Sequence, residues 1–131
     1  MRRALADAAL EPTALDAINA HATGTFLGDL AEAAALRRLF GDRWKHTPVS
    51  GVKGAIGHAM AAAGALEAIV AAYTCATGIV PPTVNLDEPD EGCELDHVVG
   101  EGRDADARTV LSVSCGMGGQ NAAIVLKRIT L

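Results

Sequence analysis

Residues 49–58 read Val49-Ser50-Gly51-Val52-Lys53-Gly54-Ala55-Ile56-Gly57-His58 and lead directly into an alanine-rich run, residues 59–76. The valines predict the end of a strand, and the glycines that follow allow a tight backbone turn. His58 then opens a long helix that is apolar on nearly all sides, a pattern typical of a helix covered by other layers. A strand, a tight turn and a buried helix in this order indicate an α/β fold.

The rest of the chain alternates between predicted helices and strands. The expected helices are residues 2–10 and 29–40, and the expected strands are residues 14–20, 109–114 and 121–127. Helical spacing places Glu32 on the water-facing side of the second helix. A surface excursion is expected at residues 83–96. The chain is one domain's worth of sequence, so we expect a mixed sheet with a central buried Ala-rich helix and covering helices over residues 1–131.

The composition narrows the classes of partner and compartment. The formal net charge is −5, with no long run of Lys or Arg to follow a phosphate backbone, so we expect no nucleic-acid partner. Cys75, Cys93 and Cys115 form no CxxC pair and leave an odd count, which favours a reducing cytoplasm over a disulfide framework. Glu67 at the centre of the alanine-rich run is costly in lipid, so we expect a buried helix and no membrane span.

Two histidines follow predicted strand ends, where α/β proteins place their functional groups. His21 lies in Ala20-His21-Ala22-Thr23-Gly24-Thr25, and His58 closes the stretch quoted first. A single histidine is at least as often structural as catalytic, but the matching settings of these two favour a shared role. Two imidazoles suit polarising a carbonyl or moving a proton, yet no obvious nucleophile accompanies them.

The polar residues near the histidines have functional and structural interpretations. Lys53 either orients a substrate carboxylate or a neighbouring group, or is a solvated loop lysine. Thr23 and Thr25 either bind the amide groups of a ligand or cap the helix that follows. Glu67 needs a hydrogen-bonding partner if it is buried, and we favour a structural role for it.

Metal and phosphate sites are not expected. His21, His58, His97 and Cys93 are scattered rather than set at metal-ligand spacing, so we expect no metal site. The run Gly116-Met117-Gly118-Gly119 joins two predicted strands and lacks a phosphate-loop pattern. It predicts a hairpin turn, whose N–H groups remain available as oxyanion donors.

Four motifs, in order, resemble the β-ketoacyl-[acyl carrier protein] synthase family. They are Asn19-Ala20-His21-Ala22-Thr23-Gly24-Thr25 with Gly28-Asp29 and Glu32, Val52-Lys53-Gly54-Ala55-Ile56-Gly57-His58 with Ala62-Ala63-Gly64-Ala65 and Glu67, Pro81-Pro82-Thr83-Val84-Asn85-Leu86-Asp87, and Gly116-Met117-Gly118-Gly119-Gln120-Asn121. The resemblance covers nearly the whole chain but corresponds only to the C-terminal half of a thiolase-like fold. It implies that the cysteine-bearing N-terminal half lies outside these 131 residues.

The resemblance implies an acyltransferase that joins malonyl-carrier protein to an acyl thioester by decarboxylative Claisen condensation. His21 and His58 match the two histidines that serve the decarboxylation, and Lys53 matches the lysine of the family's active-site network. None of the three cysteines matches the sequence context of the nucleophile. No cofactor is implied, because phosphopantetheine arrives on the acyl carrier protein.

The same resemblance assigns binding and supporting residues. Thr23 and Thr25 match threonines that bind the phosphopantetheine arm, and Met117 falls on the loop that gates the acyl pocket. Glu67 and Asp29 are expected to give structural support.

The chain also departs from the family pattern. The family often has Ser where this chain has Gly54, and Phe where it has Cys115 or Met117. The acyl-chain preference therefore does not follow from the sequence.

We therefore expect the C-terminal portion of a ketosynthase, inactive alone, that needs a cysteine-bearing half or partner chain and forms an oligomer. The alternative is a non-catalytic ketosynthase partner, similar to a chain-length factor, or a scaffold subunit. The presence of His21, Lys53 and His58 speaks against that alternative, because a scaffold has no chemical use for them. An apolar helix left partly uncovered would make the isolated chain self-associate.

Overall fold

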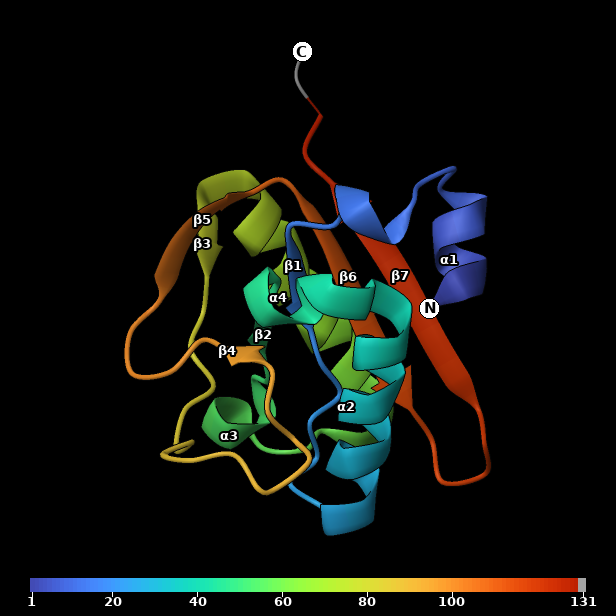
Figure 1. Cartoon of the computed structure of the whole chain (residues 1–131). Coiled ribbons are helices and arrows are strands. Elements are labelled where there is room, and N and C mark those ends of the chain that lie inside the picture. The colour runs from blue at the N-terminus through green and yellow to red at the C-terminus, as the bar shows by residue number, and fades with distance from the viewer. Residues whose placement is uncertain (130–131) are drawn as a thin grey trace.

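A five-stranded mixed sheet forms the centre of the computed structural model, which describes residues 1–129. Its strands lie in the order β4-β2-β1-β6-β7 (Figure 1). They are β1 (Ala17–Asn19), β2 (Pro48–Ser50), β4 (Asp96–His97), β6 (Thr109–Cys115) and β7 (Asn121–Lys127). The neighbours among β4, β2, β1 and β6 run parallel, and β7 pairs antiparallel with β6. A separate antiparallel pair is formed by β3 (Gly78–Val80) and β5 (Arg103–Ala107).

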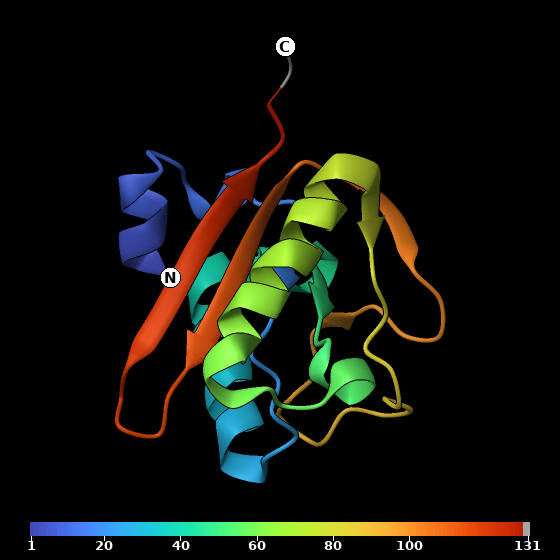
Figure 2. The same ribbon diagram turned by 180° about the vertical axis from the view of Figure 1, so that it is seen from behind.

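Helices cover both faces of the central sheet. The helix α2 (Phe26–Phe40) lies on one face, with α1 (Arg2–Asp7) beside β7, and α4 (Ala63–Thr77) lies across the other face (Figure 1 and Figure 2). One buried apolar cluster, which includes Ile18, Leu36 and Val49, joins α2 to the sheet. A second cluster, which includes Ala71 and Val110, joins α4 to the opposite face.

The parallel strands bring the two histidine segments together. Register pairs Asn19 at the end of β1 with Ser50 at the end of β2 and with Ser112 on β6. His21 follows β1 by two residues, and Lys53 follows β2 by three. Because the carboxyl ends of parallel strands meet at one edge of a sheet, the two segments lie side by side there.

The structure confirms most predicted elements and corrects their bounds. The hairpin strands β6 and β7 form where expected, and α2 begins one turn earlier than predicted, at Phe26. The first helix ends at Asp7 rather than residue 10, and the first strand is shorter because Pro12–Ala14 forms a 3-10 turn. The strands β3, β4 and β5 were not predicted, because they are short or rich in polar residues.

The alanine-rich helix differs from the prediction in where it begins. A short helix, α3 (Lys53–Ile56), precedes His58, and the 3-10 turn η3 (Met60–Ala62) separates His58 from α4. His58 therefore lies in an irregular segment, and the end of the α4 macrodipole is not at its ring.

The burial of α4 is one-sided. Residues that face the sheet, such as Glu67 and Ala71, are buried, whereas the side chains of Leu66, Ile69 and Tyr73 are 38%, 66% and 66% exposed. The expected cover on every side is thus present on one side only within residues 1–129, and Figure 2 shows the open side toward the viewer. By length and composition alone, Met60–Thr77 would qualify as a membrane span, a test that core helices also pass.

Candidate active site

The two histidines predicted to act together face each other at the carboxyl edge of the sheet. The centroids of the His21 and His58 rings are 5.6 Å apart, and the ring planes are at 88°, an edge-to-face arrangement. His21 comes from the loop between β1 and α2, and His58 from the irregular segment after α3. The fold therefore gathers the pair from two separate crossover connections.

Lys53 connects this pair to α4. Its side chain is only 5% exposed, so its interpretation as a solvated loop lysine is wrong. The Nζ atom donates to the backbone carbonyl of His21, lies 3.3 Å from His21 Nδ1, and forms an ion pair with Glu67 Oε1. Glu67 is 1% exposed, and its second carboxylate oxygen accepts the hydroxyl of Ser114 at 3.2 Å. The two charges therefore compensate each other in the interior.

Hydrogen bonding sets the tautomer of both imidazoles. The ammonium group of Lys53 can only donate, so Nδ1 of His21 acts as the acceptor. At the second histidine, the backbone N–H of Met60 donates to His58 Nδ1 at 3.2 Å. In a neutral imidazole one nitrogen accepts and the other carries the proton. Both rings therefore carry their proton on Nε2 and present it as a donor.

The environment of His21 favours the neutral ring. Burial lowers the pKa of His21 below its ordinary value of 6.5, and the charge of Lys53 lowers it further. Glu67 and Asp29 act in the opposite direction, whereas His58 again lowers the pKa. At neutral pH the His21 ring is therefore a neutral donor.

Glu32 is a site residue that the sequence interpretation missed. It was placed on the water-facing side of its helix, but its carboxylate accepts the backbone N–H of His21 at 2.7 Å and that of Ala22 at 2.8 Å. Burial raises the pKa of Glu32 above its ordinary 4.5, while the two N–H groups lower it. The placement was wrong because helical spacing does not show what a preceding loop presents to the helix. The available signal was its position in the first motif, eleven residues after His21.

Thr23 and Thr25 lie in the loop that follows His21, with their hydroxyl oxygens 2.9 Å apart. Thr25 occupies the N-cap position of α2, but its side chain makes no capping hydrogen bond there. A Cβ at Gly28 would lie 2.4 Å from Thr25 Oγ1, so the glycine leaves the space that this hydroxyl occupies. Capping therefore does not account for the Thr25 hydroxyl.

The other predicted site residues are less closely engaged. Asp29 lies in the first turn of α2, and its Oδ1 atom is buried without a hydrogen-bond partner within residues 1–129. Met117 lies on the turn between β6 and β7 with its side chain fully exposed. Desolvation raises the pKa of the thiols of Cys75, Cys93 and Cys115, so none of them is activated as a thiolate.

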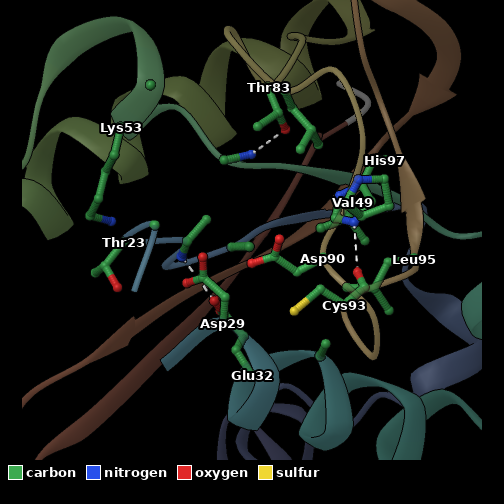
Figure 3. Close-up of a pocket in the computed structure, with 18 of the residues that line it drawn as sticks. Thr23, Asp29, Glu32, Val49, Lys53, Thr83, Asp90, Cys93, Leu95 and His97 are labelled. Carbon is green, nitrogen blue, oxygen red and sulfur yellow. Dashed lines mark hydrogen bonds between the residues drawn. The ribbon is translucent and has the colours of Figure 1, made fainter. Parts of the chain in front are cut away.

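A cavity of about 480 Å³ opens beside Lys53 and His58 and continues beneath residues 83–97. Figure 3 shows Asp90, Cys93 and His97 on that segment, across the cavity from Glu32 on α2. His97 lies on the edge strand β4, and its Nε2 is 2.9 Å from the Cys93 carbonyl. Over the described part of the chain, no three His, Cys, Asp or Glu residues are placed to hold a metal ion.

The comparison with known proteins decides the family. Residues 1–87 match the family described as β-ketoacyl synthase, C-terminal domain. The chain belongs to this family. The 3-oxoacyl-[acyl-carrier-protein] synthase 2 of Coxiella burnetii is 43% identical over 129 residues, which cover 98% of this chain and 31% of that protein.

Solved ketosynthase structures share the fold. The ishigamide ketosynthase/chain length factor superposes with a TM-score of 0.93 at 39% identity. The match covers 98% of this chain and 32% of the ishigamide protein chain. A type II polyketide ketosynthase in complex with its acyl-carrier protein gives a TM-score of 0.93 at 31% identity, covering 98% of this chain and 31% of its own. The fold is thus that of the C-terminal part of the thiolase-like ketosynthases, and the chain spans about a third of the length of these relatives.

Proposed function

We propose that this chain supplies the histidine-bearing part of the active site of a β-ketoacyl-[acyl carrier protein] synthase. The observation that carries the proposal is the pair of facing imidazoles whose Nδ1 atoms both accept hydrogen bonds. Two Nε2–H donors are left for a substrate oxygen. Membership of the β-ketoacyl synthase family supports the reaction class.

The donors suit the decarboxylation of a malonyl thioester. When the bond between the carboxylate and the α-carbon breaks, carbon dioxide leaves. The electron pair of that bond stays with the α-carbon and forms an enolate, which places negative charge on the thioester oxygen. His21 and His58 would stabilise that charge, and one such donor typically contributes about 2.7–4 kcal/mol to transition-state stabilisation. The enolate carbon then attacks an acyl thioester held on a cysteine, whose thiolate is released as the carbon–carbon bond forms.

The proposal assigns partners to two surfaces. A cysteine-bearing polypeptide would complete the site and cover the exposed side of α4, giving an oligomer or a longer chain. An acyl carrier protein would deliver the thioester on its phosphopantetheine arm, which Thr23 and Thr25 would bind, so this chain needs no cofactor of its own. The three cysteines are free thiols, which supports the cytoplasm, a reducing compartment, as the location of the protein.

The decisive experiment combines this chain with a cysteine-bearing N-terminal half and measures condensation of acyl- and malonyl-carrier protein. We expect the combination to condense and each part alone to be inactive. His21→Ala and His58→Ala should each reduce kcat by about 10²–10³-fold. His46→Ala removes an exposed histidine and is the matched control. Sustained condensation by this chain alone, or full activity of both active-site variants, would contradict the proposal.

The alternative is a non-catalytic partner that shapes the acyl cavity of a complete ketosynthase. Structures similar to this chain include assemblies of a ketosynthase with a chain length factor, and this similarity supports the alternative. The same variants separate the two functions. A partner of this kind would support condensation by a complete ketosynthase and would still do so after His21→Ala and His58→Ala.

A further inference from the structure

A line of hydrogen bonds runs from the end of β6 to the first histidine. Ser114 donates to Glu67 Oε2, Glu67 Oε1 accepts from Lys53, and Lys53 contacts both the carbonyl and Nδ1 of His21. Lys53 and Glu67 are buried, so water does not replace these contacts freely. Ser114 stands at the far end of the line from His21 and has no role in the proposed chemistry.

We propose that Ser114 is a positioning residue that fixes the Glu67 carboxylate and, through Lys53, the orientation of the His21 ring. The contact line itself stands on the structure, whereas its consequence for condensation rests on the proposed function.

The geometry explains why one hydroxyl has this effect. Each oxygen of Glu67 has one partner, so the carboxylate plane is held by Ser114 on one side and Lys53 on the other. Without the hydroxyl, one oxygen of a carboxylate that is 1% exposed loses its hydrogen bond. Because a buried carboxylate oxygen without a partner is unfavourable, the group turns toward the remaining donor.

The local fold holds the hydroxyl in place. Ser114 pairs with Ala122 of β7 near the end of the antiparallel ladder, one step before the glycine turn. On the other side, a Cβ at Gly64 would lie 3.4 Å from Ser114 Oγ, so the serine rests against the first turn of α4. Ser114 therefore ties the β6–β7 hairpin to α4 at the level of the site.

The His21 ring reports on this arrangement. Lys53, Glu67, His58 and Asp29 are the charged and titratable groups that influence it. Without the Ser114 hydroxyl, Glu67 turns toward Lys53 and neutralises the ammonium beside Nδ1 more completely. Protonation of His21 then becomes easier, and its titration midpoint rises.

The test is an NMR titration of the His21 Cε1–H resonance in the full chain, with Ser114→Ala, Ser114→Thr and Ser112→Ala compared with the original sequence. We expect a higher midpoint in Ser114→Ala and an unchanged midpoint in Ser114→Thr, which keeps the hydroxyl. Ser112→Ala is the matched control, because it removes a buried hydroxyl from the same face of the same strand. An unchanged midpoint in a folded Ser114→Ala variant overturns the inference.

A second measurement uses the enzyme completed with its cysteine-bearing half. Loss of one hydrogen bond that only positions a donor should lower kcat by about three- to tenfold with little change in KM. Ser114→Thr should recover most of the loss, and a Ser114→Ala enzyme with full kcat would contradict the inference. If the original sequence shows no condensation, the proposed function fails, while the His21 titration still decides the role of Ser114.

Discussion

The Glu32 carboxylate accepts a hydrogen bond from the backbone N–H of His21 at 2.7 Å. The other carboxylate oxygen accepts the next N–H, from Ala22, whose φ of +40° is uncommon for a residue with a side chain. Lys53 binds the carbonyl of His21 from the other direction. The peptide that carries the histidine is therefore fixed at its N–H and at its carbonyl, by two residues of opposite charge.

Replacing Glu32 by Gln should destabilise the chain in a pH-dependent way. The amide offers one acceptor oxygen where the carboxylate offered two, so one N–H loses its partner at a cost of about 1–3 kcal/mol. The pKa of Glu32 is raised in the folded state, so the native Glu is most favourable below pH 4.5 and loses stability as the pH rises through its folded pKa. Urea unfolding should show the deficit of Glu32→Gln narrowing from pH 4 to pH 7.

The matched control is Glu101→Gln, an exposed carboxylate on the loop before β5. Its free energy of unfolding should follow that of the original chain across the same pH range. A deficit of Glu32→Gln that stays constant with pH would show that Glu32 ionises as easily in the folded chain as in the unfolded one.

The buried ion pair of Lys53 and Glu67 should respond asymmetrically to substitution. Lys53→Met leaves the Glu67 carboxylate buried without its countercharge, and breaking such a pair typically costs about 3–5 kcal/mol. Lys53→Met combined with Glu67→Leu removes both charges and should recover most of that stability. Denaturant unfolding of both single variants and the double variant measures the coupling.

The exposed pair of Arg108 and Asp106 is the comparison for this experiment. Arg108→Ala should change stability far less than Lys53→Met, because water screens surface charges. Additive effects of Lys53→Met and Glu67→Leu would mean that the two groups do not compensate each other.

The sequence predicted a shared role for His21 and His58 because both follow predicted strand ends, where α/β proteins place functional groups, whereas Lys53 joined them only through the family resemblance. The hairpin of β6 and β7 was equally accessible, since two apolar segments flank a glycine turn. The roles of His21, Lys53 and His58 in condensation stay predictions, which the variants above test.

Three features lay beyond sequence patterns for physical reasons. The partners of Glu32 are backbone groups of a loop, which leave no periodic trace in the helix. The strand β4 has two residues, Asp96 and His97, too few for any alternation. The cover of α4 depends on what surrounds it, and an apolar helix has the same composition whether one side or every side is covered.

Adding a methyl group at Gly54 should be costly, whereas the same change at Gly64 should not. A Cβ at Gly54 would lie 2.3 Å from the carbonyl oxygen of Val84, a backbone atom that yields only if residues 83–86 move. Gly54→Ala should therefore lose about 1–3 kcal/mol of unfolding free energy. The serine that the family often has there would meet the same oxygen.

Gly64→Ala is the control because it lies in α4 and its nearest non-local neighbour, Ser114 Oγ, would be at an ordinary 3.4 Å. Replacing a helical glycine by alanine should raise the free energy of unfolding by about 0.5–1 kcal/mol. Thermal unfolding of the two variants under identical conditions makes the comparison. Equal stability of the two variants would show that residues 83–86 yield without cost.

The exposed side of α4 should drive association of the isolated chain. Ile69 and Tyr73 are both 66% exposed on one side of a helix whose other side packs on the sheet. Large contiguous apolar patches favour association in water. Ile69→Asp places a charge at the centre of this side without touching the sheet, so it should lower the apparent mass in analytical ultracentrifugation.

The same change should weaken binding of a cysteine-bearing half, because a buried unpaired charge is unfavourable at a covered surface. Val99→Asp, at an exposed apolar residue in the loop before β5, is the matched control and should leave both measurements unchanged. A monomeric original chain at high concentration would contradict this account of α4.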